Sequence, residues 1–66
     1  MKVNVNGETK DVPDGMTIAE FLQANKVAHV RVAIEINGRV VPRQDFDKVV
    51  IKDGDSVELV TMVGGG

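Results

Sequence analysis

Residues 30–41 read VRVAIEINGRVV and carry the clearest strand signal in the chain. Apolar β-branched residues stand at every second position from Val30 to Ile36, so they share one face of an extended strand. The residues between them share the other face: Arg31, Ala33 and Glu35. Asn37-Gly38 favours a two-residue hairpin turn, because both positions tolerate positive φ. Pro42 then ends the returning strand, since it has no N–H to donate to a neighbour.

Three more strands are predicted by the same reasoning. Asn6-Gly7 favours a hairpin between residues 1–5 and residues 8–12, and Val3 and Val5 alternate with polar residues as in a half-buried strand. The sequence SVELVTMV predicts the last strand over residues 56–63.

Between the hairpins, residues 17–25 are predicted to form one short helix. Thr17 and Glu20 have the spacing of a capping box, and Asn25 suits a left-handed residue that ends the helix. After Pro42, the segment 42–50 is predicted to contain one short helical turn with Phe46 pointing inward.

This order of elements predicts a two-layer α+β domain, in which about five strands form a mixed sheet and one helix covers one face. The helix supplies the crossover that lets the first and last strands lie parallel in the middle of the sheet. We expect the domain to span residues 1–63 and a flexible glycine tail to follow over residues 64–66.

Length and composition argue against a self-contained enzyme. A small-molecule pocket typically needs roughly 300–1,000 Å³, which a chain of 66 residues is not expected to enclose. The absence of cysteine excludes disulfides, thiolate metal sites and thiol nucleophiles. His29 is the single histidine, and Asp53-Gly54-Asp55 indicates a turn, so neither a catalytic set nor a metal site is predicted.

The charges point away from nucleic acids and membranes. Eight Lys and Arg against ten Asp and Glu give a net charge of −2, and the cations are scattered singly. Two phenylalanines are too few for a base-stacking platform. No apolar run approaches the ~20 residues of a membrane span, and the N-terminus has no signal-peptide core. We therefore expect a soluble, cytoplasmic protein.

The last three residues, Gly64, Gly65 and Gly66, are the candidate functional site. Glycines bury nothing and carry a high entropic cost, so they are not expected to stabilise the domain. A tail without side chains can enter a narrow channel in a partner protein. Its α-carboxylate is ionised at neutral pH and can attack the α-phosphorus of ATP, which would turn Gly66 into an acyl donor.

Three segments carry a family resemblance that covers essentially the whole chain. They are INGRVVPR (residues 36–43), DGDSVELV (residues 53–60) and MVGGG (residues 62–66). They resemble the ThiS family of sulfur carriers in thiamine biosynthesis, which have the ubiquitin-like β-grasp fold. The terminal diglycine is common to ubiquitin-like carriers in general, and VPR together with VGGG narrows the resemblance to this family.

The resemblance implies a carrier and not an enzyme. An E1-like adenylating enzyme of the ThiF type would activate Gly66 with ATP and Mg²⁺, and the carrier itself would bind no cofactor. A sulfur donor such as a cysteine desulfurase would then convert Gly66 to a thiocarboxylate. A thiazole synthase of the ThiG type would take the sulfur.

Strand alternation suggests where such partners dock. If Val57 faces the helix, then Val60 and Met62 lie on the open face of the sheet beside Val63 and the tail. Exposed apolar side chains at that position suit a partner's groove. The alternative is that the segment 42–50 covers them.

Three other functions remain open at this level. They are a molybdopterin-type sulfur carrier, a ubiquitin-like modifier conjugated to lysines, and a β-grasp interaction module whose glycines have no role. Loss of the last two glycines would leave only the third function unchanged.

Overall fold

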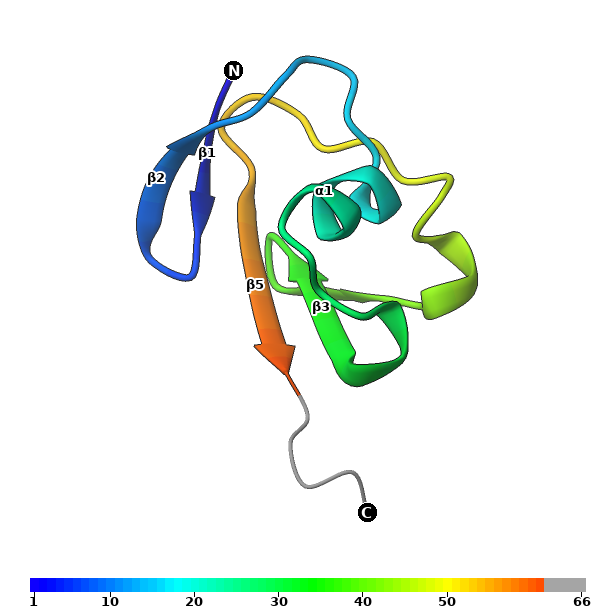
Figure 1. The fold of residues 1–66 in the computed structure, drawn as a ribbon. Coiled ribbons are helices and arrows are strands. Elements are labelled where there is room, and N and C mark those ends of the chain that lie inside the picture. Colours follow the sequence, from blue (N-terminus) through cyan, green and yellow to red (C-terminus); the bar gives the residue numbers. More distant parts are fainter. Residues whose placement is uncertain (62–66) are drawn as a thin grey trace.

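The computed structural model describes residues 1–61, apart from the side chain of His29. The sheet contains five strands, and one α-helix and two short 3₁₀ helices complete the fold (Figure 1). The strands are β1 (Lys2–Val5), β2 (Glu8–Asp11), β3 (Val32–Ile36), β4 (Arg39–Val41) and β5 (Ser56–Thr61). The helices are α1 (Ile18–Ala24), η1 (His29–Arg31) and η2 (Arg43–Asp45).

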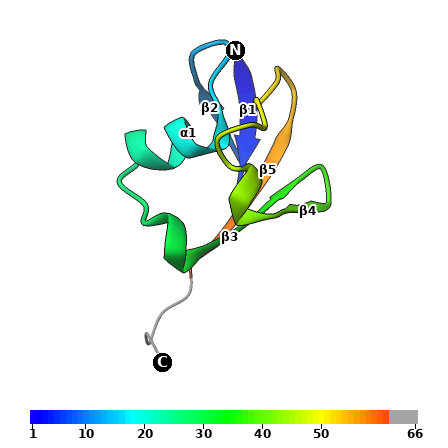
Figure 2. The same cartoon turned by 90° about the vertical axis from the view of Figure 1, so that its right-hand side faces the viewer.

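The sheet has the predicted mixed topology. Its strand order is β2-β1-β5-β3-β4, so the last strand in the sequence lies at the centre. The pair β1–β5 is parallel, and β5 is antiparallel to β3 on its other side. The prediction of parallel first and last strands in the middle of the sheet is confirmed, as is the single helix on one face (Figure 2).

The helix begins as predicted and ends differently. Thr17 is the N-cap, and both hydrogen bonds of its capping box with Glu20 are present. Asn25 is not left-handed: its φ is −97°, and its side-chain amide donates to the Phe21 carbonyl at 2.7 Å. The left-handed residue is Lys26, with φ of 58°. The helix therefore ends at Ala24, and the left-handed residue lies one position later than predicted, at Lys26.

The two hairpin turns are formed by the predicted residues. Asn6 and Gly7 have φ of 51° and 87°, and Asn37 and Gly38 have φ of 52° and 83°, as a turn with positive φ at both positions requires. Pro42 follows directly on the end of β4. One strand boundary was predicted wrongly, because Val30 lies in η1 and is exposed while β3 begins at Val32.

The core lies between α1 and the inner face of the sheet. Its members are apolar throughout: Val3, Val5, Val12, Ile18, Phe21, Leu22, Val32, Ile34, Phe46, Ile51 and Val57. Phe46, at the end of η2, is 3% exposed, which confirms its predicted inward position. Among the side chains that the structure describes, no charged or polar one is buried. Apolar burial is therefore the main stabilising contribution to this small domain.

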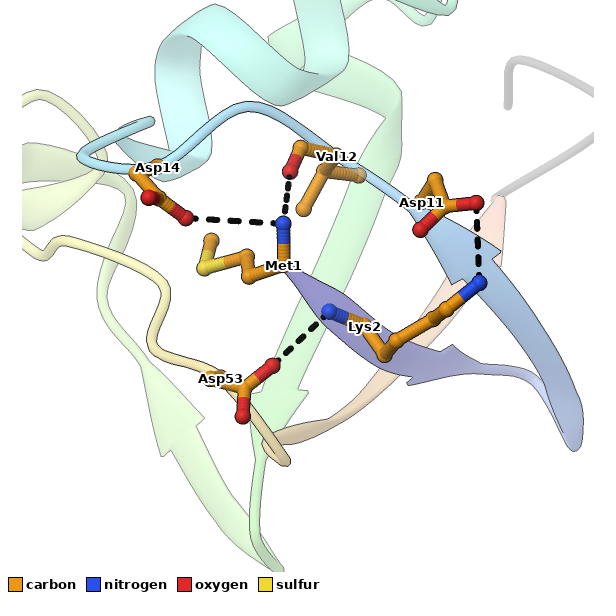
Figure 3. A network of polar contacts seen from close by, with 6 residues as sticks. All are labelled: Met1, Lys2, Asp11, Val12, Asp14 and Asp53. Carbon is orange, nitrogen blue, oxygen red and sulfur yellow. Dashed lines mark hydrogen bonds and ion pairs between the residues drawn. The ribbon is translucent and has the colours of Figure 1, made fainter.

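The start of the chain is tied to the loop that leads into α1 (Figure 3). The amine of Met1 donates to the Val12 carbonyl at 2.8 Å and lies 3.4 Å from a carboxylate oxygen of Asp14. The backbone N–H of Lys2 donates to the Asp53 carboxylate at 2.8 Å. The Met1 contacts hold the start of the chain against the loop before α1, and the Lys2 contact holds β1 against the turn before β5.

Candidate functional site

The candidate functional residues come after the central strand in the sequence. Gly64, Gly65 and Gly66 lie outside the described residues, as do Met62 and Val63, so their roles stay predictions. The structure does define the strand that precedes them. β5 runs between β1 and β3 and ends at Thr61, whose Cα is paired with that of Val32.

Two asparagines from the hairpin turns fix β5 at different points. The Leu59 N–H donates to the Asn6 side-chain oxygen at 2.8 Å, and the Asn6 amide donates to the Leu59 carbonyl at 3.2 Å. Asn37 acts in the same way at the start of the strand, where its oxygen accepts from the Ser56 N–H at 3.0 Å. Each asparagine therefore extends the hydrogen bonding of the sheet beyond its own turn.

This role of Asn6 and Asn37 was missed in the sequence. Both residues were interpreted only as turn formers, because Asn-Gly is a local signal. The partners lie 53 residues away for Asn6 and 19 residues away for Asn37. No local pattern reveals them.

The open face of the sheet carries exposed apolar side chains, as predicted for Val60. Val60 is 61% exposed, and its Cα partner Ala33 is half-buried on the same face. Val40 on β4 is 70% exposed and pairs with Glu35, so it also points to this face. Val40 was not predicted there, although a two-residue turn at Asn37-Gly38 already sets the pair of residues 35 and 40.

The segment 42–50 does not cover Val60. It packs beside the first turn of α1, where the Ile18 N–H donates to the Val49 carbonyl at 3.1 Å and the Ala19 N–H to the Phe46 carbonyl at 2.8 Å. The segment thus belongs to the helical layer. Arg43, at the start of this segment, donates from its guanidinium to the Val30 carbonyl at 3.4 Å.

The helical side of the domain holds an open groove that was not predicted. Its volume is about 320 Å³. This value lies at the low end of the range for small-molecule pockets, although a chain of 66 residues was not expected to enclose a pocket of this size. Its lining residues are Val5, Asn6, Lys10, Phe21, Asn25, Val27, Leu59 and Thr61. Asn6 and Asn25 already use their side-chain amides within the fold. The groove therefore offers a mainly apolar floor, with Lys10 as a charged residue among those that line it.

Neither a metal cluster nor a membrane helix is found in the described part of the chain. Among the described side chains, which do not include that of His29, no group of three His, Cys, Asp or Glu lies close enough to hold a metal ion. Over the same residues, no helix has the length and apolar character to cross a bilayer.

Comparisons with known proteins agree with one another. The ThiS family model matches residues 3–66. The chain is 27% identical over 66 residues to the sulfur carrier protein ThiS of Escherichia coli, and the match covers all of both chains. The crystal structure of the thiamine biosynthesis protein ThiS from Geobacter metallireducens superposes with a TM-score of 0.86 at 40% identity, again over all of both chains.

A second kind of relative is much longer. The chain is 36% identical over 66 residues to a thiazole synthase of Paramagnetospirillum magneticum. The match covers all of this chain and 20% of that protein, so the chain spans about a fifth of the length of this relative.

Proposed function

This chain belongs to the ThiS family, and from that premise we propose that it is a sulfur carrier protein of thiamine biosynthesis. It has the ubiquitin-like β-grasp fold of the family. The observation that carries the proposal is the family match, which runs from Val3 through the terminal glycines to Gly66. The full-length match to the Escherichia coli sulfur carrier supports it.

The proposed chemistry takes place on the Gly66 carboxylate. A carboxylate oxygen attacks the α-phosphorus of ATP, the bond to pyrophosphate breaks, and an acyl adenylate forms. Hydrosulfide then attacks the acyl carbon, AMP leaves, and a thiocarboxylate remains. If a desulfurase persulfide is the donor, its terminal sulfur attacks the acyl carbon, AMP leaves, and an acyl disulfide to the desulfurase cysteine forms. A second thiol then attacks the sulfur of that cysteine, a disulfide forms between the two thiols, and the thiocarboxylate is released.

In this proposal the chain contributes an acyl group and a docking surface, and its partners contribute the catalysis. An E1-like adenylating enzyme holds ATP and Mg²⁺, while the carrier binds no cofactor of its own. A cysteine desulfurase supplies the sulfur. Because activation consumes ATP, we propose that it takes place in the cytoplasm.

A thiazole synthase is the proposed acceptor of the sulfur. The similarity to a segment of a thiazole synthase chain supports this choice over the molybdopterin pathway. It indicates that a domain of this kind is found within the same polypeptide as the synthase.

The way in which β5 is held supports separate roles for the strand and for the glycine tail that follows it. The strand is held on one edge by β3 up to Thr61 and on the other by the Asn6 side chain at Leu59. A tail that leaves a strand fixed in this way starts from a defined point. We propose that Gly64, Gly65 and Gly66 enter the partner's active-site channel while Val60, Met62 and Val63 contact the partner outside it.

The experiment is an intact-mass measurement on the full chain with the adenylating enzyme, ATP, Mg²⁺ and sulfide. We expect a gain equal to the exchange of one oxygen for one sulfur, and no gain for a variant that lacks Gly66. The control is Lys52→Gln, because Lys52 is an exposed residue before the start of β5, at the opposite end of the strand from the tail. An unchanged mass with an enzyme that is active on another carrier contradicts the proposal. Higher-mass, isopeptide-linked adducts in lysate would instead indicate a modifier.

A further inference from the structure

The hydrogen bonds between the main chains of β1 and β5 stop before β5 itself ends. The Asn4 N–H donates to the Asp55 carbonyl at 2.9 Å. The Asn6 N–H donates to the Val57 carbonyl at 3.0 Å. At Asn6, whose φ is 51°, the chain turns away into the hairpin, while β5 continues to Thr61 (Figure 1). The main chain of β1 therefore does not reach the last part of β5.

The Asn6 side chain supplies the next two hydrogen bonds on this edge of β5. Its oxygen accepts from the Leu59 N–H at 2.8 Å, and its amide donates to the Leu59 carbonyl at 3.2 Å. A carboxamide offers an acceptor and a donor, as a peptide group does, so it can take the place of the missing main chain. Asparagine also adopts positive φ more readily than most other residues. Asn6 therefore serves the turn and the strand together, whereas glycine would serve only the turn.

These two bonds lie close to the point where the tail begins. β5 ends at Thr61, two positions after Leu59, and residues 62–66 follow in the sequence. Without the Asn6 side chain, the last bond to this edge would lie at Val57. The other edge would stay paired with β3, where Thr61 is the Cα partner of Val32. Loss of the Asn6 bonds should therefore loosen the end of β5 without removing it from the sheet.

We propose that Asn6 is a positioning residue for the reaction at Gly66. Its bonds to Leu59 hold the end of β5 in the sheet, so that the tail starts from one defined position before the adenylating enzyme is met. The enzyme then has fewer residues to order when Gly64, Gly65 and Gly66 enter its active-site channel. The inference rests on the proposed function, because the starting position of the tail matters only if the tail enters such a channel.

The size of the effect follows from the entropy of ordering a chain. In Asn6→Gly, residues 58–61 are held on one edge only, and the enzyme must restrict them when it binds the tail. Because β3 still restrains these residues, only part of the full ordering cost applies, and we expect kcat/KM for adenylation to fall roughly threefold to tenfold. The change should lie in KM, with kcat within about twofold, because the channel itself holds Gly66 once the tail has entered.

Asn37 provides a matched control at the opposite end of β5. Its side chain also makes two hydrogen bonds, since it accepts from the Ser56 N–H and donates to the Asp55 carboxylate, both at 3.0 Å. Like Asn6, it precedes a glycine and has a positive φ, of 52°. Asn37→Gly should therefore lower the urea midpoint about as much as Asn6→Gly. Its kcat/KM should stay within about twofold of the unchanged chain, because the loosened end is remote from the tail.

A second variant at the same position separates the two bonds. In Asn6→Asp the carboxylate can still accept from the Leu59 N–H, but it has no N–H to donate to the Leu59 carbonyl. Its kcat/KM should lie between those of the unchanged chain and Asn6→Gly. Asn37→Asp adds the same charge at the other end of β5 and is its control. This pair tests the inference even if Asn6→Gly does not fold.

The measurement is steady-state release of pyrophosphate by the adenylating enzyme with ATP and Mg²⁺, at varied concentrations of each full-length variant, beside urea unfolding of the free chains. The expected result is a higher KM for the Asn6 variants alone, although the Asn37 variants are equally destabilised.

Equal losses of kcat/KM in Asn6→Gly and Asn37→Gly would show that only stability matters and would overturn the inference. An unchanged kcat/KM in Asn6→Gly, or a loss confined to kcat, would overturn it as well. In each of these cases the unchanged chain is still adenylated, so the proposed function stands. If the unchanged chain is never adenylated, the proposed function fails and the inference fails with it.

Discussion

The two faces of the sheet differ in what they contribute to the molecule. On the helix side, Val57 is 1% exposed and Ile34 is completely buried, and no polar residue is buried among the described side chains. On the open side, the same strands present Glu58, Val60 and Glu35, with Val40 beside them. One face stabilises the fold, and the other carries exposed apolar and uncompensated charged groups that do not.

The difference shows that in a domain of 66 residues one set of side chains can stabilise the fold while the alternate set on the same strands stays available for binding a partner. Neighbouring residues of β5 point to opposite faces, so one strand serves both purposes. Substitutions on the two faces should therefore have effects of opposite kinds.

The largest expected effect is on the buried face. Ile34→Ala should lower the free energy of unfolding by about 2–5 kcal/mol, because it leaves a cavity at a site with no exposure. Small domains have little stability to spare. Urea unfolding followed by far-ultraviolet circular dichroism measures the change. A loss below about 1 kcal/mol, which is the scale of a surface substitution, would show that the inner face is not the main source of stability.

A matched pair on β5 tests both faces with one residue type. Val57→Ala should cost roughly 1.5–3 kcal/mol, since it removes buried methyl groups. Val60→Ala should change stability by no more than about 0.5 kcal/mol, yet weaken binding to the adenylating enzyme. Unfolding and calorimetry on both variants give the comparison. Equal losses of stability would contradict the assignment of faces.

The asparagines that fix β5 should have an intermediate effect. Asn6→Gly keeps the positive φ of the turn but removes both bonds to Leu59, so we expect a loss of about 1–2 kcal/mol. Asn37→Gly is the matched variant at the other end of the strand. Amide exchange should rise near Leu59 only for the first and near Ser56 only for the second. Faster exchange at both ends in either variant would mean that β5 opens as a unit.

The smallest effect is expected at the end of the sheet, away from both faces. Asp14→Asn removes the ion pair with the Met1 amine and should cost less than about 1 kcal/mol. The difference should vanish in about 1 M salt, where the screening length is about 3 Å. Chemical unfolding in urea at low and high salt checks this. A loss that persists in salt would show that the contact is not an exposed ion pair.

Much of the fold could be predicted because its signals are local. Asn-Gly at residues 6–7 and 37–38 fixed both hairpins, and the spacing of Thr17 and Glu20 fixed the start of α1. The strand position predicted for Val30 was wrong because the apolar alternation already begins in η1, before the start of β3. The predicted end of α1 was wrong because the Asn25 side-chain amide donates a hydrogen bond to the Phe21 carbonyl. The left-handed conformation is adopted by the next residue, Lys26.

The site was less predictable because its contacts join distant parts of the chain. The exposure of Val60 follows from alternation within one strand. The pairing of Glu35 with Glu58 depends on the register of β3 against β5, which no turn sets. The groove beside Phe21 and Leu59 likewise depends on how α1 lies over the sheet.

The most direct test of the two-face account is a methyl NMR titration of the full chain, labelled at valine methyl groups, with the adenylating enzyme. The account predicts that the signals of Val40 and Val60 shift or broaden first, while those of Val3 and Val57 keep their positions. Val27, which lines the groove on the helical side, serves as the internal comparison. Perturbation of Val27 with no change at Val40 and Val60 would contradict the account and place the docking surface on the opposite side of the domain.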